Sequence, residues 1–297
     1  MNINTIPIIP TEWRRLILFA LMGVFIVTPA LASIVEESLP SGTIVGADYR
    51  PGKSNLPAVL LIHGFLQTRD FPTVAHLADG LSAAGYTTLT PTLSLGISHR
   101  IRSLPCEAIH QHSMEQDVSE IRFWANWLAQ RQHTKIILIG HSYGSLQSII
   151  YGIGHPNPAI QQIIALSLTD ADFHVTAANK KTLIKYLKEQ SARHNTDLVK
   201  HQLGYCKTYI SPPENSLSYI KWDRPQILNA LSRSHIPLTV IMGSTDDRMG
   251  PDWPNLIRKQ GTDVKIIKGA NHFFDNQYEF DLLDLTLSSI RRHQKVH

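Results

Sequence analysis

Short apolar runs and longer amphipathic stretches alternate along the chain from residue 58 onward. Short runs rich in β-branched residues predict buried strands, and apolar positions three or four residues apart predict helices. The predicted strands are residues 58–62, 86–90, 136–139, 163–168, 237–243 and 264–267, and the helices are residues 73–84, 114–131 and 143–151. Alternation of this kind is typical of a mostly parallel sheet covered by helices on both faces.

The alternation stops between residue 168 and the strand that starts at residue 237. Within this gap the pattern predicts a helix over residues 177–202, a loop over 212–216 and a short helix over 225–234. We therefore expect residues 171–235, approximately, to form an insertion between two strands of the sheet.

A glycine-flanked serine follows the predicted strand at residues 136–139, in the pentapeptide Gly140-His141-Ser142-Tyr143-Gly144. Apolar residues then continue at helical spacing, so the serine is expected on a sharp turn between strand and helix, with its hydroxyl exposed. Glycines are needed on both sides if a side chain there would collide with a neighbouring strand or helix. The pattern predicts Ser142 as a nucleophile.

A base and an acid are available further along the chain. A serine hydroxyl is a poor nucleophile at neutral pH unless a base accepts its proton. His272 follows the last predicted strand, and neutral imidazole suits this task because its ordinary pKa is about 6.5. Asp246 and Asp247 follow the strand before it, and a carboxylate there can hold the imidazole in the required tautomer. From these residues alone, either aspartate could serve.

Taken in order, four short motifs resemble those of the α/β-hydrolase superfamily. They are His63-Gly64-Phe65, Gly140-His141-Ser142-Tyr143-Gly144, Gly243-x-x-Asp246 and Asn271-His272. Each is a modest signal alone, but each follows a predicted strand, and together they span the chain from about residue 56 to the C-terminus. The resemblance implies an α/β-hydrolase fold with a mostly parallel central sheet, flanking helices and a helical cap insertion over residues 171–235. Such a cap would cover the site and exclude water from it. A surface insertion with no role in the site is the alternative.

The resemblance also assigns roles to particular residues. It favours Asp246 over Asp247 as the acid of a catalytic triad with Ser142 and His272. It implies that the backbone N–H groups of Phe65 and Tyr143 form an oxyanion hole, the pair of donors that stabilises a negatively charged oxygen. Residues 91–98 resemble the loop after the family's next strand, although the usual charged residue before its glycine is missing.

We predict a serine hydrolase that cleaves a carboxylic ester, or a related small acyl compound, through an acyl-enzyme. Thioesters, amides and peptides stay open as substrates. Acyl transfer by the same triad and a non-catalytic binding protein of the same fold are the alternatives, because a fold does not determine a reaction.

Charge and residue spacing argue against nucleic acid and metal as partners. The formal net charge of +4 comes without a block of basic residues, so nucleic acid is not an expected partner. Cys106, His110, His112 and Asp117 have a metal-like composition, but their spacing matches no tight zinc pattern. We expect no metal and no cofactor.

The N-terminus resembles a secretory signal peptide. Arginines at positions 14 and 15 precede an uncharged apolar run over residues 16–27, and Ala30-Leu31-Ala32 supplies an A-x-A ending. The run is shorter than the roughly 20 residues that a spanning helix needs, although an uncleaved anchor is the alternative. We therefore expect residues 1–32 to be a signal peptide, residues 33–297 to form one secreted or periplasmic domain, and no stable membrane anchor after cleavage.

The chain contains two cysteines, Cys106 and Cys206. In an oxidising compartment they could form one disulfide, which would connect the loop after the strand at residues 86–90 to the insertion. Two free buried thiols are the alternative, and the sequence leaves both open.

Signal cleavage has a direct test. We expect the exported protein to begin at Ser33, because the A-x-A ending is followed there by the mature chain. Mass spectrometry of the N-terminal peptide from the secreted or periplasmic fraction measures this. An exported protein that retains residues 13–32 would contradict cleavage and indicate an anchor.

Overall fold

The computed structural model describes residues 33–170 and 177–296, all within the unit Leu31–His297. The predicted signal peptide and the first residues of the insertion lie outside the described residues. The strands are β1 (Ser33–Ser38), β2 (Ile44–Arg50), β3 (Ala58–Ile62), β4 (Thr87–Thr92), β5 (Ile136–His141), β6 (Ile160–Leu166), β7 (Val199–Leu203), β8 (Cys206–Ser211), β9 (Leu238–Gly243) and β10 (Asp263–Ile267). The helices are α2 (Pro72–Ala83), α3 (Met114–Gln130), α4 (Tyr143–Ile153), α5 (Ala177–Ala192), α6 (Pro213–Ile220), α7 (Arg224–Ser232), α8 (Trp253–Arg258) and α9 (Tyr278–Val296).

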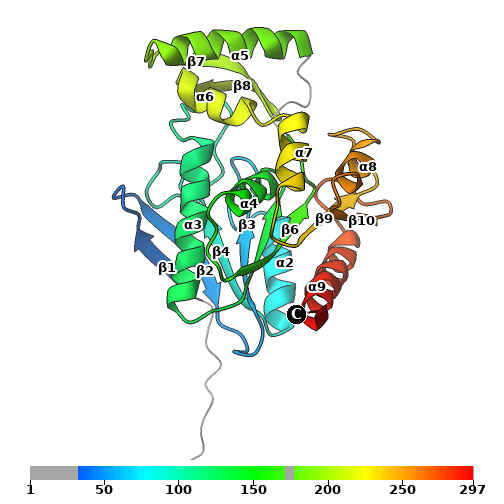
Figure 1. Ribbon diagram of the computed structural model, residues 1–297. Helices are drawn as coiled ribbons and strands as arrows, with labels where there is room; N and C mark the ends of the chain where they lie inside the picture. Colours follow the sequence, from blue (N-terminus) through cyan, green and yellow to red (C-terminus); the bar gives the residue numbers. More distant parts are fainter. Residues whose placement is uncertain (1–32, 171–176, 297) are drawn as a thin grey trace, which may run out of the picture. The chain divides into compact units, whose positions relative to one another are not determined.

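A central sheet orders its strands β1-β2-β4-β3-β5-β6-β9-β10 (Figure 1). From β4 to β10 all neighbours are parallel, whereas β2 pairs antiparallel with both β1 and β4. The predicted mostly parallel α/β fold is therefore confirmed. Parallel strands bring their carboxyl ends to one edge of the sheet, so the loops after β3, β5, β9 and β10 share that edge.

Helices bury both faces of the sheet, which explains why β3 and β5 are apolar without alternation. On β5, Leu138 belongs to the core that contains Trp124 of α3 and Leu146 of α4. The next residue, Ile139, points to the opposite face and joins the core beneath α2 and α9. The strand that leads to Ser142 is thus buried between two apolar layers.

The insertion between β6 and β9 contains α5, a separate two-stranded antiparallel sheet of β7 and β8, then α6 and α7. The helix predicted over residues 177–202 was wrong beyond Ala192, where α5 ends. His194 there has a positive φ of 52°, and the Asn195 side chain accepts a hydrogen bond from the Asp197 N–H. Such side-chain bonds favour a turn over a continued helix.

Other elements also depart from the prediction. The loop predicted at residues 212–216 is largely the first part of α6, since Pro213 fits an early helical position, where no N–H partner is needed. No element was predicted for the segments that form β1, β2, β8, α8 and α9. Strand β1 has no fully buried residue, so it lacks the apolar run that marks the inner strands.

Cys106 and Cys206 form a disulfide, with Cα atoms 5.3 Å apart. It joins the loop after β4 to the first residue of β8. Near it, the backbone N–H of His110 donates to the carbonyl oxygen of Ile210 at 2.8 Å. The loop after β4 and the β7–β8 hairpin are therefore held together covalently and by backbone pairing.

Candidate active site

Ser142 lies at the turn between β5 and α4 in an unusual backbone conformation, with φ 56° and ψ −119°. A non-glycine residue adopts such angles only when its surroundings enforce them. A Cβ atom on Gly144 would lie 2.5 Å from the carbonyl oxygens of Ile62 and His63, and one on Gly140 would collide with the carbonyl group of Gly144. The two glycines allow this close approach, and the turn presents the Ser142 hydroxyl at the edge of the sheet.

His272 lies beside this hydroxyl. The Ser142 Oγ–H can donate to His272 Nε2 at 2.9 Å, and His272 Nδ1–H can donate to Asp246 Oδ2 at 2.7 Å. These three side chains come from the ends of β5, β9 and β10, separated by up to 130 residues. The structure therefore brings together the serine, histidine and aspartate that the sequence singled out.

The two aspartates differ in their surroundings. Asp246 contacts His272, and its other oxygen accepts the Arg248 backbone N–H at 3.4 Å. Asp247 is exposed. Adjacent residues at the end of a strand point in different directions, so the backbone admits one of the two to the imidazole.

Burial and charge tune this group of side chains. Burial lowers the pKa of His272 because it disfavours the charged imidazolium, while the hydrogen bond and charge of Asp246 oppose that shift. Burial by itself raises the pKa of Asp246, but the hydrogen bond and charge of His272 and the proximity of Arg248 lower it overall. At neutral pH the arrangement is a neutral imidazole between a hydroxyl and a carboxylate, which can move a proton from Ser142 to His272.

The backbone of His272 is also held, by two residues that the sequence reading did not assign. His141 Nε2–H donates to the His272 carbonyl oxygen at 3.1 Å, and Ser167 Oγ–H donates to the same oxygen at 2.8 Å. Burial lowers the pKa of His141 to about 3, so its ring is neutral. His141 is the variable residue of the serine pentapeptide, and its position beside Ser142 was the available signal.

The segment after β3 lies against Ser142. A Cβ atom on Gly64 would lie 3.3 Å from the Cβ of Ser142, and the rings of Phe65 and Tyr143 have centroids 4.6 Å apart. The two residues expected to supply the oxyanion donors thus contact each other, and one of them follows a glycine that lies beside Ser142.

The residues of metal-like composition, which include Cys106, His110 and Asp117, make contacts within the protein. Cys106 is in the disulfide, and His110 stacks on Tyr209 with centroids 4.3 Å apart. Asp117 accepts hydrogen bonds from Tyr219 Oη at 2.5 Å and from Gln147 Nε2 at 2.8 Å. The hydrogen bonds of Asp117 form a buried polar network between α3, α4 and α6.

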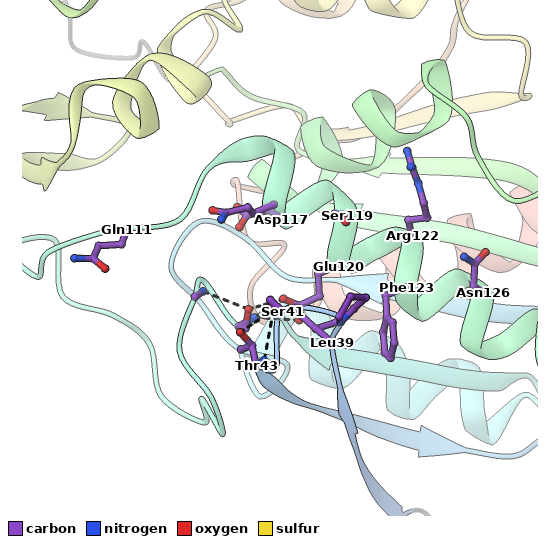
Figure 2. A pocket seen from close by; sticks show the side chains of 14 residues that line it. Leu39, Ser41, Thr43, Gln111, Asp117, Ser119, Glu120, Arg122, Phe123 and Asn126 are labelled. Atoms are coloured by element: carbon purple, nitrogen blue, oxygen red, sulfur yellow. Dashed lines mark hydrogen bonds between the residues drawn. The ribbon is translucent and has the colours of Figure 1, made fainter. Parts of the chain in front are cut away.

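A separate cavity of about 540 Å³ lies between the β1–β2 turn, the loop after β4 and α3 (Figure 2). Glu120 on its wall accepts hydrogen bonds from the backbone N–H of Ser94 at 2.9 Å and from Ser94 Oγ at 2.7 Å. Burial raises the pKa of Glu120 to about 7. This carboxyl group supports the loop over residues 91–98, where the sequence showed no charged residue before Gly96.

A family model described as the alpha/beta hydrolase family matches residues 59–279. No curated protein matches the chain in sequence. The chain resembles the alpha/beta hydrolase GrgF from Penicillium sp. sh18 at 14% identity, covering 89% of this chain and 99% of that one, with a TM-score of 0.67. It also resembles a monoacylglycerol lipase from Paleococcus ferrophilus (15% identity, 89% and 100% covered, TM-score 0.60) and Est1E from Butyrivibrio proteoclasticus (15%, 89% and 98%, 0.59). At these identities the likeness shows a shared fold.

The contacts of His272 predict its titration. Its pKa should lie below the ordinary histidine value of 6.5, because burial outweighs the carboxylate. Asp246→Asn should lower the pKa further by removing that carboxylate, whereas Asp247→Asn, at an exposed neighbour, should change it less. Nitrogen-15 NMR, with His272→Gln to assign the resonance, measures all three. A pKa at or above 6.5, or equal effects of the two variants, would contradict this electrostatic description.

Proposed function

The chain belongs to the alpha/beta hydrolase family, and on that premise we propose that it is an exported serine hydrolase of carboxylic esters. The observation that carries the proposal is the hydrogen-bonded series Ser142–His272–Asp246, with distances of 2.9 and 2.7 Å. In the proposed reaction, these three residues form the catalytic triad.

The first half of the reaction forms an acyl-enzyme. Ser142 Oγ attacks the carbonyl carbon of the substrate while His272 Nε2 takes the hydroxyl proton. Asp246 holds the ring so that Nε2 faces the serine and stabilises the imidazolium that forms. The tetrahedral intermediate collapses, His272 delivers the proton to the leaving alkoxide, and an alcohol departs.

The second half returns the enzyme to its starting state. A water molecule loses a proton to His272 and attacks the acyl carbon, and the carboxylic acid leaves as Ser142 recovers its proton. In both halves, the backbone N–H groups of Phe65 and Tyr143 would donate to the negatively charged oxygen. The close approach of Gly64 to Ser142 and the contact between the Phe65 and Tyr143 rings support this role.

Small acyl compounds fit the aromatic surroundings of the serine. The centroid of the Phe65 ring lies 4.6–6.2 Å from those of four tyrosine rings, at Tyr143, Tyr205, Tyr209 and Tyr219. Three of these rings belong to the insertion, which supports a role for it as a cap over the site. Uncharged esters are the first candidates for such a site, and thioesters and amides follow because they react by the same route.

The disulfide supports export. Disulfides persist in oxidising compartments, and they are rare in reducing ones. The bond between Cys106 and Cys206 and the A-x-A ending at residues 30–32 thus favour the same secreted or periplasmic location.

Replacement of the nucleophile tests the reaction class. Ser142→Ala should lose covalent labelling by a fluorophosphonate and reduce hydrolysis of p-nitrophenyl esters at least ~10³-fold, because no acyl intermediate can form. Ser148→Ala, at a buried serine on α4, the helix that follows Ser142, is the matched control and should keep both. Near-native turnover by Ser142→Ala would reject the triad, and a wild-type chain without labelling or turnover would indicate a binding protein.

The two aspartates should differ in turnover. Asp246→Asn should reduce kcat by up to roughly 10⁴-fold, because the amide favours the wrong imidazole tautomer. Asp247→Asn is the matched control, since Asp247 is exposed, and kcat should change little. Steady-state kinetics on one ester measures both, and the reverse order would transfer the role to Asp247.

A further inference from the structure

Three consecutive carbonyl groups after Gly64 each accept a hydrogen bond from a distant residue. The Phe65 oxygen accepts from Tyr205 Oη at 3.1 Å, and the Leu66 oxygen accepts from the Leu104 backbone N–H at 3.0 Å. The Gln67 oxygen accepts from Arg100 Nη2 at 2.7 Å. We call residues 64–67 the oxyanion loop, because it contains Phe65. Its backbone is held from outside at every peptide group from Phe65 to Gln67.

The loop needs such support. Leu66 has a positive φ of 57°, which a residue with a side chain adopts only under constraint. Within the loop, the Gln67 N–H donates to the Gly64 carbonyl oxygen at 3.2 Å, and the partners outside the loop hold the same turn from Phe65 to Gln67. The direction of the Phe65 N–H depends in turn on the same short stretch of backbone.

Arg100 supplies the most extensive of these contacts. Its side chain is buried, and its Nε and Nη1 donate to the carbonyl oxygens of Leu93 at 2.7 Å and Arg102 at 2.9 Å. Its Nη2 also lies 3.3 Å from His63 Nε2, which accepts the Leu93 N–H at 3.0 Å. One guanidinium thus connects the oxyanion loop to the loop after β4, because its planar group offers five N–H donors.

Tyr205 contacts the same loop from the insertion. It lies at the turn of the β7–β8 hairpin, where its ring meets Phe65 edge-on with centroids 5.8 Å apart. At the neighbouring Gly204, a Cβ atom would lie 3.8 Å from the Phe65 ring and 3.9 Å from the Tyr143 ring. The hairpin turn therefore rests on both residues expected to supply the oxyanion donors.

The disulfide links the two segments that make these contacts. Cys206 directly follows Tyr205, and Cys106 lies two residues after Leu104. The two segments that hold the oxyanion loop, residues 100–104 and the hairpin turn, are thereby joined covalently. The disulfide limits how far these two segments can separate, because it holds the Cα atoms of the two cysteines 5.3 Å apart.

We propose that Arg100 and Tyr205 are positioning residues for the oxyanion hole. We further propose that the Cys106–Cys206 disulfide holds together the two segments that carry them. The inference rests on the proposed hydrolase function. A displacement of catalytic groups by about 1 Å can reduce a rate by 10²-fold, so loss of one contact should act mainly on kcat.

Tyr205→Phe removes one hydroxyl and retains the ring. We expect kcat for a p-nitrophenyl ester to fall roughly 10-fold with little change in KM, because the missing bond acts on the transition-state donor. Tyr186→Phe is the matched control, since Tyr186 has the same exposed fraction of 45% and also lies in the insertion. An unchanged kcat for Tyr205→Phe would overturn its role.

A boronic acid inhibitor separates positioning from general destabilisation. It forms a tetrahedral adduct on the serine, so its Ki should rise by the same factor by which kcat/KM falls in each variant. Arg100→Lys keeps the charge but cannot reach all three carbonyl groups and should behave like Tyr205→Phe. Arg102→Lys, at an exposed neighbour, should match the wild type. A loss of kcat with an unchanged Ki would overturn the inference.

The disulfide is tested by a double-mutant cycle. Cys106→Ser with Cys206→Ser should lower kcat, and adding Tyr205→Phe to that chain should reduce it little further, because both changes release the same contact. Fully multiplicative losses, or an unchanged kcat in the disulfide-free chain, would overturn the coupling. A wild-type chain that is neither labelled by a fluorophosphonate nor active would overturn the proposed function itself.

Discussion

The backbone at Ser142 is the constraint on which the rest of the site depends. Its φ of 56° is sustained because Gly140 and Gly144 let β5, α4 and the end of β3 approach closely. A wrongly placed side chain at either glycine would push the helix away from the strand. The unfavourable backbone angles are stabilised by the two apolar layers that bury β5. The core of the fold therefore determines the direction of one hydroxyl group.

The other groups around Ser142 are held largely through main-chain atoms. The carbonyl oxygen of His272 accepts hydrogen bonds from His141 and Ser167. The carbonyl groups of Phe65, Leu66 and Gln67 accept from Tyr205, Leu104 and Arg100. Bonds to backbone atoms orient a loop without requiring a particular side chain in it. A site built from loops thereby obtains some of the rigidity of a strand.

The insertion contacts the loop beside Ser142 and places aromatic side chains next to it. Its β7–β8 hairpin is linked to the body of the unit by the disulfide and by the backbone bond from His110 to Ile210. Buried tyrosines at positions 209 and 219 extend from it toward Phe65. A change in the hairpin would therefore reach the backbone of the loop beside Ser142.

The sequence by itself determined the parallel sheet, because β3 and β5 are continuous apolar runs whose burial requires helices on both faces. It also identified Ser142, His272 and the aspartate pair, since each follows a strand and parallel strands end at one edge. It missed β1, which has no buried face, and it extended the helix before β7 through a turn set by Asn195. Only the tertiary structure decided that Asp246 rather than Asp247 meets the imidazole, that the cysteines pair, and that Arg100 binds three carbonyl groups. Those outcomes depend on distances between segments far apart in the chain, which local apolar patterns do not specify.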